Sequence, residues 1–259
     1  MNDDARLSSA LGPDRWRLVA RPLGKVLRLR RWWACLLVAL AATALPALGA
    51  TYHYVDWTSA NLAQGTAAGT IALPNGSTVG VTFKVVNQDG TPGQIHGVQT
   101  SGGTNYWVPS GTYTGAVVSN APAITDIVQL VGSPGQTYVI TLSKVVKNPI
   151  MAIASLGAPG IPVMYKFTAF APFTILSQGP GYWGSGSLSA PTGTALVGEE
   201  GSGTIQFTGD LSTVGWTASG QETWHGFTVG IRGDDAPRHR ARSPPGRPTP
   251  PSPRRSPAC

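Results

Sequence analysis

Hydrophobic and polar residues alternate along much of this chain. The pattern is clearest in residues 203–208, 213–217 and 223–231, where apolar side chains occupy every second position over much of each segment. Alternation with a period of two is typical of a strand that buries one face. The pairs Gly209-Asp210 and Ser219-Gly220 lie between the segments and favour turns. We therefore expect three consecutive strands here, which form the last layer of a single folded domain.

Short segments of the same kind precede these three. One of them, 150–156, is apolar at nearly every position, as expected for a strand that is covered on both faces. Glycine and proline separate the segments, and no amphipathic helical pattern is present. The other segments are 52–57, 69–73, 79–86, 113–118, 126–131, 136–142, 162–167 and 173–176.

About a dozen strands at this spacing predict an all-β fold, an antiparallel two-sheet sandwich. A jelly roll is our first choice of topology. An immunoglobulin-like sandwich is the second, and a β-helix is the third because the chain has no fixed repeat period. Residues 74–77 predict a tight hairpin turn in which Asn75 and Gly76 both take positive φ. Residues 88–105, rich in Gly, Thr and Ser, predict a long loop.

The two ends of the chain differ from its middle. Residues 1–31 carry eight Lys and Arg, and the uncharged residues 32–50 follow, ending in small side chains. This order predicts a secretory signal peptide over residues 1–50, and an uncleaved membrane anchor is the alternative. Residues 232–259 combine seven Arg with many Pro and predict a disordered tail. The folded domain is then 51–231, and we expect membrane contact only through the leader.

The charge of the predicted domain limits its partners. The whole chain has a net charge of +7, but residues 51–231 hold four Lys and no Arg against seven Asp and Glu, which gives −3. A nucleic-acid-binding domain usually presents a basic patch, so we expect no specific nucleic-acid partner. Both cysteines, Cys35 and Cys259, lie outside the domain. Disulfides and thiolate metal sites are therefore not expected within it.

A glycine-rich segment, 179–184, matches the spacing G-x-G-x-x-G. A dinucleotide site needs that motif at the start of a helix, whereas Pro191 and several glycines follow here, so we expect a loop and no cofactor. The loop displays Tyr182 and Trp183, and exposed aromatic rings can stack on sugar rings. Trp107 and Trp224 are further candidates for a glycan site. The alternative is that these tryptophans cap the core.

Acidic residues and histidines give weaker signals. Glu199 and Glu200 are adjacent, so on a strand they point to opposite faces and cannot by themselves form the facing carboxylate pair of a glycoside hydrolase. The histidines of the domain lack the spacing of a metal site, and His225 is interpreted as structural. Three aspartates are candidates for calcium ligands because oxygen-rich loops bind this ion. They are Asp56, Asp89 and Asp126.

Six stretches together resemble secreted bacterial proteins of the PEP-CTERM class, which the exosortase system handles in bacteria that produce exopolysaccharide. The resemblance covers about residues 30–231, and it implies a surface or matrix protein with a β-sandwich body and no catalytic residues to transfer. The C-terminal sorting motif of that class, Val-Pro-Glu-Pro before an apolar helix, is missing from residue 233 onward. The stretches are YVDWT at 54–58, ITDI at 124–127, NPIMAIASLG at 148–157, PFTIL at 172–176, GTIQFTG at 203–209 and WHGFTVG at 224–230.

These observations predict a secreted, non-enzymatic protein of the cell envelope or biofilm matrix that binds extracellular polysaccharide. The alternative is a glycan hydrolase or lyase on a jelly-roll scaffold. A purely structural matrix protein is a third possibility. A concave face with clustered carboxylates would favour the enzyme, and an exposed aromatic strip without them would favour the binding protein.

Overall fold

The computed structural model describes residues 49–233 of the 259-residue chain. The predicted leader and the predicted tail lie outside these residues, apart from Gly49, Ala50, Arg232 and Gly233. Within the described range, no helix has both the length and the apolar character needed to cross a membrane. Cleavage of the leader and disorder of the tail therefore stay predictions.

Strands make up most of the described residues, and one short 3₁₀ helix, η1, joins them. The elements are β1 (Tyr52–Tyr54), β2 (Asp56–Asn61), β3 (Thr66–Ala72), β4 (Thr78–Asn87), β5 (Gly97–Gln99), η1 (Ser110–Tyr113), β6 (Ile127–Gly132), β7 (Gln136–Lys147), β8 (Ile150–Leu156), β9 (Val163–Phe167), β10 (Phe173–Gly179), β11 (Ser187–Thr192), β12 (Ala195–Glu199), β13 (Gly201–Phe207), β14 (Asp210–Ser219) and β15 (Glu222–Arg232).

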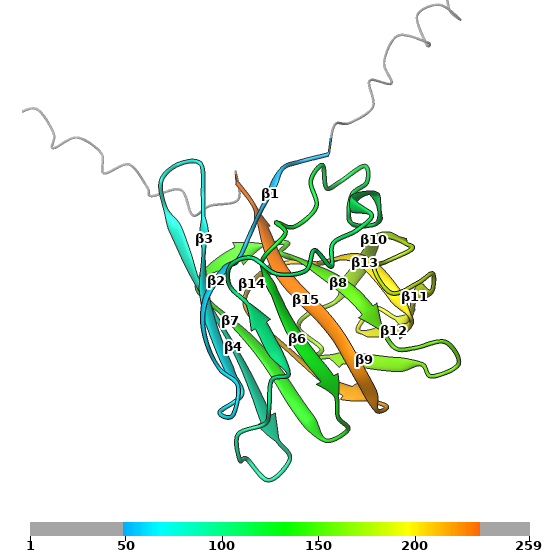
Figure 1. Ribbon diagram of the computed structural model, residues 1–259. Helices are drawn as coiled ribbons and strands as arrows, with labels where there is room; N and C mark the ends of the chain where they lie inside the picture. The colour runs from blue at the N-terminus through cyan, green and yellow to red at the C-terminus, as the bar shows by residue number, and fades with distance from the viewer. Residues whose placement is uncertain (1–48, 234–259) are drawn as a thin grey trace, which may run out of the picture. The chain divides into compact units, whose positions relative to one another are not determined.

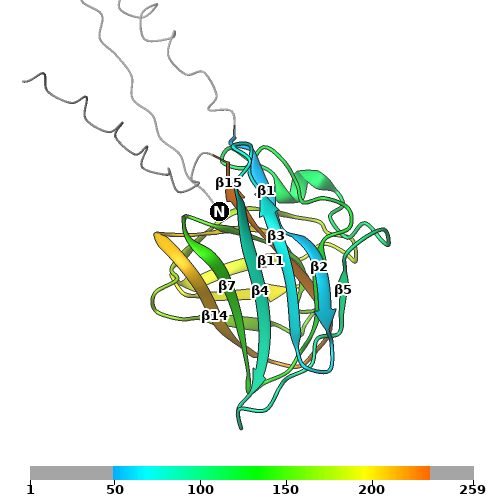
Figure 2. The same cartoon turned by 90° about the vertical axis from the view of Figure 1, so that its left-hand side faces the viewer.

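The strands form two antiparallel sheets that pack as a sandwich, which confirms the predicted fold class (Figure 1). The seven-stranded sheet has the order β10-β13-β8-β15-β6-β5, and β1 pairs with the end of β15. The eight-stranded sheet has the order β11-β12-β9-β14-β7-β4-β3-β2. Figure 2 shows β14, β7, β4 and β3 side by side in this second sheet.

The pairing of the central strands is that of a jelly roll. Strand β6 pairs with β15, β7 with β14, β8 with β13, and β9 with β12, and successive pairs belong to alternate sheets. This is the pattern of one long antiparallel hairpin rolled over itself. The prediction that the last three strands form one layer is therefore wrong. Strands β13 and β15 flank β8 in one sheet, and β14 lies in the other.

The hydrophobic core fills the space between the sheets. Its centre is a group of aromatic rings around Trp216, whose ring centroid lies 5.4 Å from that of Tyr138 and 5.5 Å from that of Phe227. Strand β8 contributes Met151 and Ile153 to this core. Every residue of β8 is buried, because the opposite face of the strand is covered as well.

The cover on the outer face of β8 is the long segment that precedes β6. Trp107 and Tyr113 from this segment pack against Ala152 and Ala154 of β8. Residues 113–118 were predicted as a strand, and that prediction is wrong: Tyr113 ends η1, and Val118 makes one isolated bridge to Ala50. Apolar side chains are spaced similarly in a strand and in a loop that anchors itself on a sheet, which explains the error.

The hairpin between β3 and β4 forms where the Asn-Gly pair predicted it, but with a different backbone. Gly76 has a φ of 78°, whereas Asn75 is not among the non-glycine residues with positive φ. The Asn75 side chain instead accepts a hydrogen bond from the backbone N–H of Ser77 at 2.9 Å. Side-chain hydrogen bonding to the turn backbone is a second reason why asparagine favours turns.

Candidate functional site

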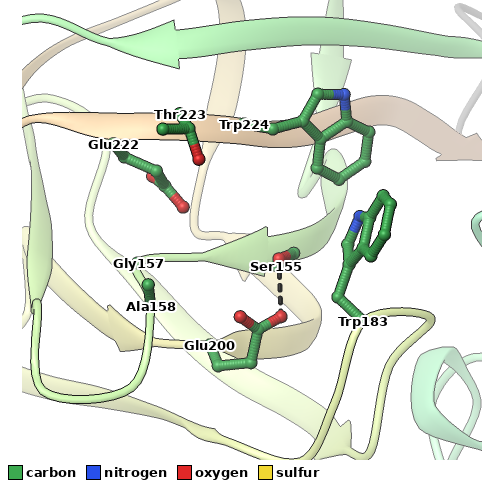
Figure 3. A pocket seen from close by; sticks show the side chains of 8 residues that line it. All are labelled: Ser155, Gly157, Ala158, Trp183, Glu200, Glu222, Thr223 and Trp224. Carbon is green, nitrogen blue, oxygen red and sulfur yellow. Dashed lines mark hydrogen bonds between the residues drawn. The ribbon is translucent and has the colours of Figure 1, made fainter.

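A pocket of about 280 Å³ lies at one end of the seven-stranded sheet, where β8 ends and β13 and β15 begin (Figure 3). Four segments that are distant in sequence contribute to it. They are the end of β8 with the turn that follows, the β10–β11 loop, the junction of β12 with β13, and the start of β15. The lining residues are Ser155, Gly157, Ala158, Trp183, Glu200, Glu222, Thr223 and Trp224.

Two lining residues have an unusual backbone conformation. Ser155 has a φ of 59° and Glu200 a φ of 56°, and within residues 49–233 only one other non-glycine residue, Asn148, has a positive φ. This conformation costs an L-residue about 1–2 kcal/mol. The Ser155 hydroxyl donates a hydrogen bond of 2.6 Å to Glu200 Oε1, and the Ser155 N–H donates to Ser202 Oγ at 3.0 Å. Residues in strained conformations are frequent at functional sites. Here two such residues, Ser155 and Glu200, are joined by a side-chain hydrogen bond.

The sheet is also irregular at this end. A bulge in β8 includes Ser155, where the pairing with β13 shifts register, and a second bulge in β15 lies between Glu222 and His225. Bulges re-aim side chains and are frequent beside functional sites. The second bulge brings Thr223 and Trp224 to the pocket. The two bulges lie in the neighbouring strands β8 and β15, so both distort the end of the sheet that forms the pocket.

Glu222 is a buried carboxylate in the pocket lining. Its side chain is 2% exposed, and its Oε2 lies 2.9 Å from Nδ1 of the fully buried His225. Neither carboxylate oxygen makes a hydrogen bond. Figure 3 shows the Glu222 carboxylate directed toward the Ser155–Glu200 pair rather than away from the pocket. His225, interpreted from the sequence as structural, therefore lies against a residue of the site.

One side of the pocket is aromatic. We call Tyr106, Tyr182, Trp183 and Trp224 the aromatic cluster: Trp183 and Trp224 have ring centroids 6.0 Å apart, Tyr106 lies 4.7 Å from Trp224, and Tyr182 lies 5.0 Å from Trp183. Trp183 is 57% exposed and Tyr182 is 44% exposed. The Trp224 indole N–H donates to Gln129 Oε1 at 3.2 Å, which orients its ring.

The predicted aromatic candidates thus divide into two groups. Tyr182, Trp183 and Trp224 come together in the aromatic cluster, and two of them line the pocket. Trp107 does not join them, because it is 2% exposed and packs edge-on against Tyr113 at 5.1 Å. Its ring cannot face a ligand, and it has the core-capping role that was the alternative interpretation. Tyr106 was missed because its neighbour Trp107 was taken as the candidate of this aromatic pair, and the sequence does not show which of the two faces outward.

The loop that carries Tyr182 and Trp183 is held tightly against the sheet. It joins β10 to β11, so a strand and not a helix follows the G-x-G-x-x-G motif. A Cβ at Gly186 would lie 1.9 Å from the Glu199 carbonyl oxygen, so only glycine allows this approach. The loop is closed by a 2.7 Å hydrogen bond from the Gly181 N–H to the Gly184 carbonyl. Trp183 is therefore exposed but placed on a fixed loop.

Two of the three calcium candidates, Asp56 and Asp126, lie near each other, and Asp89 lies in a different turn. Asp126 accepts a 3.0 Å hydrogen bond from the Trp57 N–H, and burial raises its pKa, with the nearby charge of Asp56 acting in the same direction. Asp89 lies in an exposed turn, where the hydroxyl and then the N–H of Thr91 lower its pKa. In the part of the chain that the structure describes, no three His, Cys, Asp or Glu side chains form a group that could hold a metal ion. The calcium hypothesis stays a prediction.

Of the two pocket carboxylates, only Glu200 was singled out from the sequence. The Glu199-Glu200 pair does point two ways: Glu199 accepts a hydrogen bond from the Gly160 N–H at 2.7 Å, and Glu200 lines the pocket. The second pocket carboxylate, Glu222, and the hydroxyl of Ser155 had no sequence signal.

Comparisons of this chain with models of protein families, with curated proteins and with solved structures found no match.

Proposed function

We propose that this protein binds glycans in the pocket at the end of the seven-stranded sheet, as a secreted, non-enzymatic protein of the cell envelope or biofilm matrix. The observation that carries the proposal is the combination of an exposed indole, Trp183, with hydrogen-bonding groups of Glu200 and Ser155 in one pocket. A sugar has an apolar C–H face and a rim of hydroxyls. The C–H face packs on an aromatic ring, and the hydroxyls form hydrogen bonds with carboxylate and hydroxyl oxygens.

Rigid placement of these groups supports binding. Trp224 is fixed by Gln129 and Tyr106, and Glu200 is fixed by Ser155. Groups that are already ordered lose little conformational entropy when a ligand binds. The secreted location is supported by the basic and apolar leader pattern and by the resemblance to exported matrix proteins.

The proposal is tested by glycan-array binding of the full chain and of a Trp183→Ala variant. Truncation of an anchoring tryptophan is expected to weaken binding about tenfold, since such residues contribute more than about 1 kcal/mol. Phe170→Ala is the matched control: Phe170 is 85% exposed and lies in the β9–β10 loop, at the end of β9 away from the pocket turn. Equal affinity of the Trp183→Ala variant and the parent protein would remove Trp183 from the site, and no binding to any glycan would reject the function.

A second candidate is glycan hydrolysis, which the two pocket carboxylates favour. Glu200 and Glu222 come from different strand junctions and have different partners, a serine hydroxyl and a histidine. Glycoside hydrolases use two carboxyl groups in unlike surroundings. Release of new reducing ends from a bound glycan, abolished in both Glu200→Gln and Glu222→Gln, would establish the enzyme. Binding without release would leave the first function.

A further inference from the structure

The lysines of the domain are far from being evenly distributed. Within residues 49–233 they lie in β4, β7 and β9, three strands of the eight-stranded sheet. The pocket lies at the end of the other sheet and has no Lys or Arg among its lining residues. Arg232 ends β15, whereas Glu222 begins it, so the length of the strand separates them. Glu200 therefore gives the pocket an acidic character, and Glu222 adds a carboxylate that contacts His225 at 2.9 Å.

One of these carboxylates lacks partners that its burial demands. Glu222 Oε2 has an ion-pair contact with His225, but Oε1 is buried and has no hydrogen-bond partner. A buried polar atom that is left unpaired is costly and calls for an explanation. His225 does not line the pocket, so it faces Glu222 from the protein side. Both Glu222 oxygens are buried beneath the pocket lining, so a direct hydrogen bond to a ligand is left to Glu200.

The other wall of the pocket also favours a positive charge. Trp183 and Trp224 lie together on the side opposite Gly157 and Ala158 (Figure 3). The face of an indole ring attracts a cation, and the attraction grows when water is excluded. An ammonium group has three N–H donors and no acceptor. It therefore complements carboxylate oxygens on one side and indole rings on the other.

We propose that the pocket selects glycans that carry free amino groups, such as glucosamine oligomers, over N-acetylated, neutral or anionic glycans. This inference rests on the proposed glycan-binding function and names the ligand class of the same pocket. An N-acetyl group removes the positive charge and keeps one donor, so it leaves the carboxylates poorly matched. A uronate adds a negative charge beside Glu200 and Glu222 and is repelled.

The test is a calorimetric titration of the full chain at a pH where the sugar amines are protonated. Four oligosaccharides of equal length are compared: glucosamine, N-acetylglucosamine, glucose and glucuronate oligomers, with a lysine-rich peptide as a fifth ligand. The glucosamine oligomer is expected to bind about tenfold tighter than the N-acetylated one, because one partly desolvated cation–π contact contributes an affinity gain of about this size. The preference should weaken with added salt. Glu200→Gln should reduce it, while Phe170→Ala should leave it unchanged.

Each outcome decides between the two proposals. Equal affinity for glucosamine and neutral oligomers overturns the selection for amines and leaves glycan binding intact. Failure of every glycan to bind rejects both proposals. A lysine-rich peptide that binds as tightly as the glucosamine oligomer overturns the glycan assignment. If Glu200→Gln does not fold, the ligand series and its salt dependence on the parent protein still decide the question.

Discussion

Replacement of two tryptophans, Trp216 and Trp183, tests the division of this domain into a core and a site. The same chemical change, Trp→Ala, is made at a side chain that is 1% exposed and at one that is 57% exposed. Trp216 lies at the centre of the core, in β14, and Trp183 lies in the β10–β11 loop. The ring centroids around Trp216 lie 5.9 Å away for Phe83, 5.4 Å for Tyr138, 5.5 Å for Tyr165, 5.8 Å for Phe167 and 5.5 Å for Phe227.

The magnitude follows from this packing. Truncation of a buried tryptophan to alanine costs about 3–5 kcal/mol, and aromatic pairs add about 0.5–1.5 kcal/mol each beyond the area that they bury. We therefore expect Trp216→Ala to fall at the upper end of the first range. Against a total stability of about 5–15 kcal/mol, the loss is a large share. For a domain of this size it corresponds to a fall in Tm of roughly 6–20 °C.

Urea denaturation followed by circular dichroism measures both variants without relying on tryptophan fluorescence. Trp183→Ala is expected to lower the free energy of unfolding by only about 0.5–1.5 kcal/mol, because its exposed ring still contacts Tyr182 and Trp224. If Trp216→Ala does not fold, Trp216→Phe is used and should lose about 1–3 kcal/mol. A loss below about 1 kcal/mol at Trp216 for either variant, or a larger loss at Trp183 than at Trp216, would refute the assignment of these rings to core and surface.

Two further predictions concern Asp126 and Gly186. Burial raises the pKa of Asp126, so the folded state holds its proton more tightly than the unfolded chain, and stability from this group is lost as pH rises above about 3.9. Asp126→Asn keeps an acceptor for the Trp57 N–H, so its stability relative to the parent should increase as pH rises. Urea denaturation at several pH values measures this, and a difference in the free energy of unfolding that does not change with pH would contradict the prediction. Gly186→Ala should cost about 1–3 kcal/mol of stability and weaken the proposed glycan binding, because the new Cβ meets the backbone of Glu199 and Glu200. Gly193→Ala, which meets nothing within 4 Å, is its control.

Local patterns explain the successes of the sequence-based predictions. Strands β13, β14 and β15 were predicted because a sheet that buries one face repeats every two residues. Strand β8 was predicted to be covered on both faces because nearly all its residues are apolar, and the cover proved to be the loop with Trp107 and Tyr113. Strand β11 was missed because it is an edge strand whose six residues include two Ser and a Pro, and β12 was missed because its five residues are too few to show a clear period.

The candidate site was predictable only in part. Trp183 and Tyr182 stood out because two aromatic residues in a glycine-rich loop have no local core to join. Glu200 and Glu222 could not be paired in advance, because they are brought together by β13 and β15, which both flank β8. The positive φ of Ser155 and Glu200 was also invisible, since neither residue type favours that conformation.

The sequence by itself determined that this domain is built from strands and has hydrophobic faces to bury, because both properties depend on neighbours within a few residues. Only the tertiary structure decided which residues share a pocket. Rolling the chain into a jelly roll pairs strands that are distant in sequence. Two bulges and the positive φ of Ser155 and Glu200 then place Ser155, Glu200 and Glu222 in one pocket with Trp183 and Trp224. These positions depend on strand register and backbone irregularity, which arise from the packing of the whole domain.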